Sequence, residues 1–184
     1  MTVILLFFVA HWYLSLFFQT FFLHRYAAHK AFTMNKFTEK VFFFLTWFFQ
    51  GSNYLSPYGY GVMHRMHHAF ADTEDDPHSP KYDETIWKMM WKTKTIYSDI
   101  ANRRLIPDKR FTEGVPQWEA FDRFARSWPS RIFWAAIYIS VYAQFATAWW
   151  LWLLLPLHFL MSPIHGAIIN WFAHKYGYRN FPVG

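Results

Sequence analysis

Residues 3–23 read VILLFFVAHWYLSLFFQTFFL and lead directly into HRYAAH at residues 24–29. The first of these segments contains no charged residue. As an α-helix it would extend about 31 Å, which is enough to cross the hydrocarbon core of a bilayer. It has neither the basic start nor the small-residue cleavage site of a signal peptide. We therefore predict a retained membrane span that ends at His24.

A second uncharged segment covers residues 132–174 and is long enough for two crossings, which we predict at about 131–147 and 150–173. The apolar run within residues 38–51 is too short for a crossing and is expected to be interfacial or re-entrant. A full crossing there would also place the histidines before and after it on opposite faces of the bilayer. The sequence thus predicts an all-α integral membrane bundle with a polar cap.

Charged residues are confined to part of the chain. All 12 acidic residues lie between Glu39 and Asp122, and the basic residues lie between Arg25 and Arg131 or at Lys175 and Arg179. The net charge of +6 does not indicate nucleic-acid binding, because the basic residues alternate with acidic ones and flank the apolar segments. By the positive-inside rule, they place the cap on the cytoplasmic face. The absence of cysteine excludes disulfides and thiolate metal sites within this chain.

Two short histidine clusters point to metal binding. At about 100° per residue, His64 and His68 of HRMHH project about 40° apart on a helix, whereas His67 points about 100° away from His68. One helical turn can therefore supply ligands to two metals. His24 and His29 lie about 140° apart, so they would face one metal best if the helix ended or unwound between them.

The chemistry of these clusters favours iron. Three imidazoles on one turn repel one another when protonated and cost desolvation free energy when buried, which a bound metal offsets. A structural zinc needs four ligands and would not use this many imidazoles. Two irons with open positions for O₂ suit the histidine-rich pattern better. Asn170 and His174 are four residues apart and share a helix face, so the amide could hold a metal-bound water.

The other histidines stand alone in the sequence. We expect His11, His158 and His165 to be polar residues packed inside the bundle, with a haem held by His158 and His165 as the alternative. His78 in DDPHSP is expected to support the metal ligands without binding metal itself.

The segments HRYAAH, HRMHHAFADTEDDPHSP and NWFAHKYGYRNF, in this order, resemble the integral-membrane fatty acyl-CoA desaturases of the stearoyl-CoA Δ9-desaturase type. The resemblance implies a di-iron centre in which one iron is bound by His24, His29, His64 and His68. It implies that His67 and His174 bind the second iron and that Asn170 holds a water on it.

The resemblance also implies the reaction and its participants. These enzymes use O₂ and two external electrons, from a donor such as ferredoxin or cytochrome b5, to form a cis double bond in a fatty acyl chain. The implied substrate is a fatty acyl-CoA, or an acyl chain on another carrier, and the implied pathway is unsaturated fatty acid biosynthesis.

We expect a single desaturase domain over residues 1–184. The family's last histidine box, HNxHH, would follow YGYRNF by a few tens of residues, beyond Gly184. We therefore expect the domain to be incomplete at its C-terminus and its activity to require that box. A membrane fatty acid or sterol hydroxylase and a non-catalytic haem- or metal-binding membrane protein are the alternatives. The DPHS and NWFAHKYGYR segments favour the desaturase over the hydroxylase.

Overall fold

The computed structural model describes residues 1–71 and 73–173, and this part of the chain is helical and contains no strand. The predicted all-α class is therefore confirmed for these residues. In chain order the elements are α1 (Thr2–Phe18), π-helix η1 (Gln19–Ala28), α2 (Lys36–Gln50), 3-10 turn η2 (Gly51–Asn53), α3 (Pro57–Phe70), α4 (Ile86–Ala101), α5 (Lys109–Thr112), α6 (Glu119–Ala125), α7 (Trp128–Phe145), 3-10 helix η3 (Trp149–Leu154), α8 (Leu155–His158), α9 (Met161–Ala167) and π-helix η4 (Ile168–Ala173).

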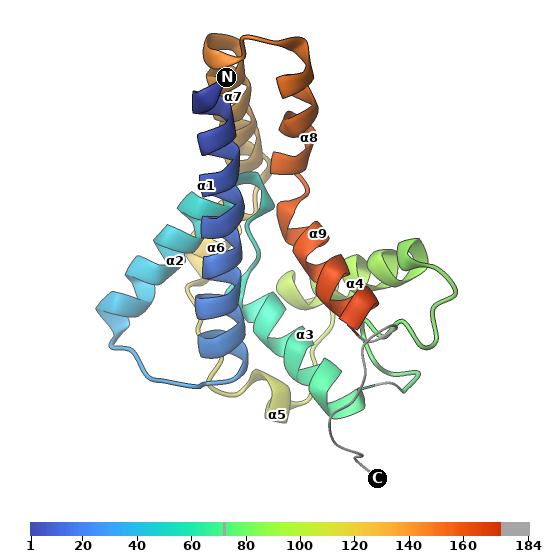
Figure 1. Cartoon of the computed structure of the whole chain (residues 1–184). Helices are drawn as coiled ribbons and strands as arrows, with labels where there is room; N and C mark the ends of the chain where they lie inside the picture. Colours follow the sequence, from blue (N-terminus) through green and yellow to red (C-terminus); the bar gives the residue numbers. More distant parts are fainter. Residues whose placement is uncertain (72, 174–184) are drawn as a thin grey trace.

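The apolar helices α1, α7 and α8 stand side by side, and α3, α4 and α5 spread out at the opposite end of the molecule from the N-terminus (Figure 1). Among the described residues, α1 and η1 together form the one unbent helix that is long and apolar enough to span a membrane, Thr2–Ala28. On α1, Ile4, His11, Ser15 and Phe18 form a buried stripe. Most other apolar side chains of this helix are exposed, as lipid contact would require.

The C-terminal apolar segment is bent. The helices Trp149–His158 and Met161–Phe172 together have the length and apolarity of a span, but they meet at an angle of 70°. Pro163 explains the break, because it has no N–H to continue the helical hydrogen bonds of the preceding turn. The segment predicted as a span at 150–173 is thus occupied by this bent pair of helices, and the segment predicted at 131–147 overlaps α7.

Helix α2 returns the chain to the end of α1. It packs on α1 and η1 through Phe49 against Phe18 and Phe43 against Phe22, with ring centroids 5.0 and 5.4 Å apart. It ends at Gly51, whose φ of +56° and contact with the Tyr138 hydroxyl leave no room for a side chain. The chain then turns through η2 into α3, so that HRYAAH and HRMHH lie at the same end of the molecule.

A separate apolar core lies at the end of the molecule opposite the N-terminus. There α3 packs against α4 and the α5 region through the buried side chains of Tyr58, Val62, Met63, Ile100, Phe111 and Val115. On another face of α3, Gly61 lies against Ala27, because a Cβ at Gly61 would come within 3.1 Å of the Ala27 carbonyl oxygen. This close approach of α3 to η1 positions the two histidine boxes against each other.

Candidate metal centre

Four imidazoles from the two boxes converge where η1 ends against α3. The Nε2 atom of His64 lies 3.1 Å from Nε2 of His29 and 3.0 Å from Nε2 of His68. The His24 ring lies 4.6 Å, centroid to centroid, from the rings of both His29 and His64. The possible ligand atoms of His24, His29 and His64 all lie within 4.8 Å of one another. The structure thus brings together the four histidines expected to bind one iron.

The spacing of these nitrogens fits a shared metal better than hydrogen bonding. A ring nitrogen carries either one proton or one in-plane lone pair, so Nε2 of His64 can make one good hydrogen bond and not two. Its contacts with His29 and His68 therefore cannot both be hydrogen bonds. Ligands at right angles on a metal with bonds of about 2.1 Å lie about 3.0 Å apart, which matches both contacts.

The surroundings of His64 keep its ring neutral. Burial, with the nearby imidazoles of His24, His68 and His29 adding to it, lowers the pKa of His64 to about 2. A neutral imidazole is the form that binds a metal. Tyr60 stacks on the same ring, with centroids 5.6 Å apart and planes at 10°, and this packing restricts ring rotation.

A π-helical turn joins the two histidines of the first box. The amide of His29 donates to the carbonyl of His24 at 3.0 Å, a bond between residues five apart. The wider π-turn brings residues at this spacing onto one side of the helix, as often occurs at functional sites. The sequence suggested that the helix would end or unwind between His24 and His29. It does neither, because a π-turn bridges the two residues. It widens and ends at His29.

Arg65 joins the segment HRMHH to the segment HRYAAH. Its guanidinium donates to the carbonyl oxygens of Ala28 and Ala27 at 2.7 and 2.8 Å, and to those of Phe111 and Glu113 at 3.2 and 2.9 Å. Partial burial lowers the pKa of Arg65. The guanidinium satisfies carbonyls at the end of η1, where a positive charge also matches the helix dipole. No sequence pattern distinguishes this arginine from the other basic residues of the chain.

A second group lies beside the first. Nδ1 of His67 lies 2.8 and 3.0 Å from the two carboxylate oxygens of Asp76, and the His67 and His78 rings are 4.1 Å apart. All three side chains are buried, and their possible ligand atoms lie within 4.8 Å of one another. His67 and His78 were expected near the metal from the sequence, but Asp76 was not. Asp76 belongs to the acidic segment DDPHSP, and the sequence does not show that it is buried while the neighbouring Asp75 is exposed.

The remaining residues expected at the site lie near the C-terminus. Asn170 is half-buried in η4, and its role as a water-holding amide stays a prediction. His174 lies outside the described residues, so its expected place on the second iron also stays a prediction.

The isolated histidines pack inside the bundle. His158 pairs with His11 through their Nδ1 atoms, 2.6 Å apart, and the Tyr142 hydroxyl lies 3.0 Å from Nε2 of His158. His165 packs instead against Trp12, 4.6 Å between centroids. The His11 and His158 rings are stacked, with centroids 4.9 Å apart. Because both ring nitrogens of His158 have partners within the bundle, His158 offers no free nitrogen to a haem iron.

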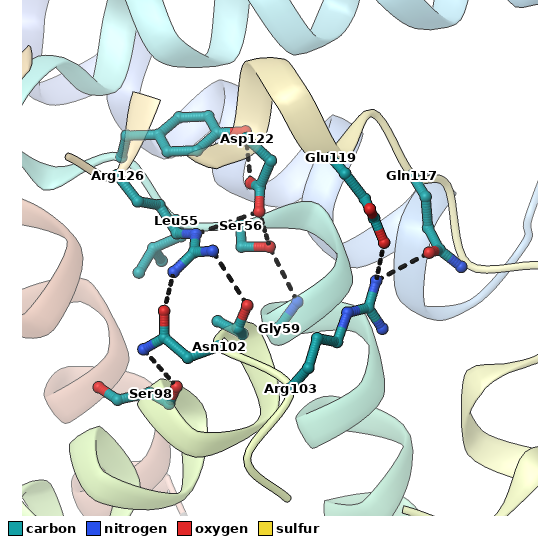
Figure 2. Close-up of polar contacts among 12 residues, drawn as sticks. Leu55, Ser56, Gly59, Ser98, Asn102, Arg103, Gln117, Glu119, Asp122 and Arg126 are labelled. Carbon is teal, nitrogen blue, oxygen red and sulfur yellow. Dashed lines mark hydrogen bonds and ion pairs between the residues drawn. The ribbon is translucent and has the colours of Figure 1, made fainter. Parts of the chain in front are cut away.

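A buried carboxylate holds the start of α3, the helix that carries HRMHH (Figure 2). Asp122 accepts hydrogen bonds from the hydroxyls of Ser56 and Tyr54, each at 3.0 Å, and from Nε of Arg126 at 3.1 Å. Ser56 in turn caps α3 by accepting from the Gly59 amide at 3.1 Å. Burial raises the pKa of Tyr54, and the carboxylate of Asp122 raises it further.

The structure defines a helical protein whose apolar bundle carries a histidine-rich centre at one end. The chain belongs to the fatty acid desaturase family, which it matches over residues 1–183. Members of this family are membrane-associated and typically use iron.

Two relatives from Arabidopsis thaliana show the same relationship. Delta-9 desaturase-like 4 protein is 34% identical over 79 residues, which are 42% of this chain and 25% of that protein. Delta-9 desaturase-like 5 protein is 29% identical over 124 residues, which are 65% of this chain and 38% of that protein. The chain thus spans well under half the length of either relative. No solved structure matches it.

Proposed function

We propose that the protein takes part in O₂-dependent desaturation of a saturated fatty acyl chain, carried as an acyl-CoA, at a histidine-ligated di-iron centre. The observation that carries the proposal is the convergence of four imidazoles: Nε2 of His64 stands at the spacing of metal ligands from Nε2 of both His29 and His68, and the His24 ring lies beside them. Similarity to two Delta-9 desaturase-like proteins supports the choice of desaturation over hydroxylation.

In this proposal the chain supplies neutral nitrogens and holds them in place. His24, His29, His64 and His68 bind one iron, and His67 and His174 bind the second, with Asn170 holding a water on it. Bound iron supplies the activation of O₂ that removes two hydrogens from adjacent methylenes. The balance is one –CH₂–CH₂– unit, O₂, two electrons and two protons giving –CH=CH– and two waters. Arg65 and Asp122 hold the segments HRYAAH and HRMHH in position relative to each other.

The substrate and the electron donor approach from different environments. The acyl chain is apolar and belongs among the bundle helices, while its charged carrier stays at the cap on the cytoplasmic face, where the basic residues are concentrated. Ferredoxin or cytochrome b5 supplies the electrons. The lipid bilayer surrounds the bundle, and the proposed spans are at 3–23, 131–147 and 150–173.

The test is product analysis in cells that lack their own Δ9-desaturase. The chain is expressed as given and with a C-terminal extension that contains the HNxHH box of a relative. We expect low iron content and no new monoene from the 184-residue form, and both iron and a cis-monoene from the extended form. A hydroxylated acid would support the hydroxylase instead. Equal iron and equal product from both forms would show that the additional box is not needed.

A further inference from the structure

We propose that Asp76 positions His67 by accepting its Nδ1 proton, so that Nε2 is the atom presented to metal. Asp76 is then a positioning residue and not a ligand. The inference rests on the proposed function, because the metal concerned is the second iron. It adds a residue to the site that neither the histidine pattern nor the family match assigns.

The burial of this pair shows why the contact must be strong. Asp76 has no solvent-exposed surface, and His67 is only 5% exposed. A buried carboxylate is costly unless it is hydrogen-bonded, and here both of its oxygens lie within 3.0 Å of Nδ1 of His67. The amide of His78 donates to Oδ1 of Asp76 at 3.0 Å, which ties the carboxylate to its own loop. The loop thus holds a fixed acceptor at the Nδ1 edge of the imidazole ring.

The direction of the hydrogen bond follows from the chemistry of the two groups. An ionised carboxylate can only accept, and a neutral imidazole carries one ring proton. The proton therefore belongs on Nδ1, and the lone pair on Nε2. In the cluster around His64, by contrast, the close contacts join ring nitrogens to one another. The pairing of His67 with Asp76 is complete without metal, so it orients a ligand and does not itself need an ion.

The position of the ring places Nε2 for a second metal next to the first. The His67 ring centroid is 5.5 Å from that of His68 and 6.1 Å from that of His64. His78 packs against His67 at 4.1 Å and 33°, which limits rotation of the ring. With rotation limited by His78 and the tautomer set by Asp76, His67 can offer only one nitrogen to metal. Loss of such a carboxylate partner typically weakens metal affinity about 10- to 100-fold.

The experiment compares Asp76→Asn with Asp75→Asn, a matched control that removes the same charge from an exposed position on the same loop. In metal-free protein in detergent, ¹⁵N NMR of labelled histidine reports the tautomer of each ring. We expect the His67 ring, identified by its loss in His67→Ala, to be held as the Nδ1–H tautomer in the wild type and in the control. In Asp76→Asn the same ring should populate a mixture of the two neutral tautomers, because an amide can face it with either its oxygen or its nitrogen.

Anaerobic titration of the extended form with Co²⁺ then measures metal affinity, since Co²⁺ reports its ligands by its visible spectrum. We expect a tight phase from the four-histidine cluster and a weaker phase from His67. Asp76→Asn should weaken only the weaker phase, about 10- to 100-fold. In a His67→Ala background, the same change should have no effect on metal binding.

The outcomes separate this inference from the proposed function. A wild type with one phase, or none, would contradict the dinuclear centre. Two phases with identical behaviour of Asp76→Asn and Asp75→Asn would overturn the positioning role. Complete loss of the weaker phase at saturating Co²⁺, with a changed visible spectrum, would overturn it in favour of direct binding by Asp76. An equal loss in the His67→Ala background would show that Asp76 acts only on the loop.

Discussion

Nε of Arg65 donates to the carbonyl oxygen of Ala28 at 2.7 Å, and this bond joins the helix of HRMHH to the end of the helix of HRYAAH. The same guanidinium reaches three further carbonyls. Together with the close approach of Gly61 to Ala27, this side chain fixes the distance between the two histidine segments of the metal centre. The positions of the imidazole nitrogens that would bind metal depend on this distance, because metal–ligand distances tolerate shifts of only a few tenths of an ångström.

Arg65→Lys should reduce both stability and metal content. An ammonium lacks the planar fork that donates to four carbonyls, so carbonyls at the end of η1 lose their partners. We expect the free energy of unfolding to fall by about 2 kcal/mol and iron per chain to fall with it. Arg25→Lys is the control, because Arg25 follows His24 as Arg65 follows His64 but is exposed. Thermal unfolding in detergent and plasma emission give the two readouts, and equal values for both variants would contradict this role.

Alanine at any predicted iron ligand should abolish desaturation in the extended form. For His29 and His68, loss of one imidazole also leaves the metal with too few ligands, so iron per chain should drop sharply. His165→Ala should retain substantial activity and iron, because neither ring nitrogen of His165 has a hydrogen-bond partner in the described part of the chain. If His165→Ala proved as damaging as His68→Ala, the assignment of ligands would be wrong.

His158→Ala should destabilise the bundle without changing iron content. His158 has no solvent-exposed surface, and its loss leaves His11 and the Tyr142 hydroxyl without their partner inside the bundle. We expect a loss of about 1–3 kcal/mol in the free energy of unfolding. The measurement is thermal unfolding beside iron per chain. A normal melting temperature together with lost iron would mean that His158 serves the metal centre.

The proposed topology places the cap and the C-terminal tail on one face of the membrane. Because the chain has no cysteine, single cysteines at Thr95 and Arg179 can be labelled cleanly in oriented vesicles. Both should react with an impermeant thiol reagent from the cytoplasmic side. Thr147, in the turn after α7 at the other end of the bundle, should react only from the opposite side (Figure 1). Labelling of Thr95 and Arg179 from opposite sides would place the cap and the C-terminal tail on different faces of the membrane. Ligands from these two segments could then not share one metal centre.

Local sequence determined the helices and the candidate ligands. The uncharged run before His24 can bury its backbone polar groups only as a helix, and imidazoles placed four apart must share a helix face. The helical fold, the apolar first helix and the histidine clusters therefore follow from composition and spacing, which act over a few residues.

Tertiary structure decided which of these groups meet. The pairing of His158 with His11, 147 residues apart, depends on the packing of helices that are distant in the sequence, as does the approach of Gly61 to Ala27. The π-turn between His24 and His29 and the contact of Asp76 with His67 join residues only five and nine positions apart, but the period of a regular α-helix does not encode either of them. The sequence by itself determined that this chain carries metal-binding side chains, and packing alone decided their geometry and their partners.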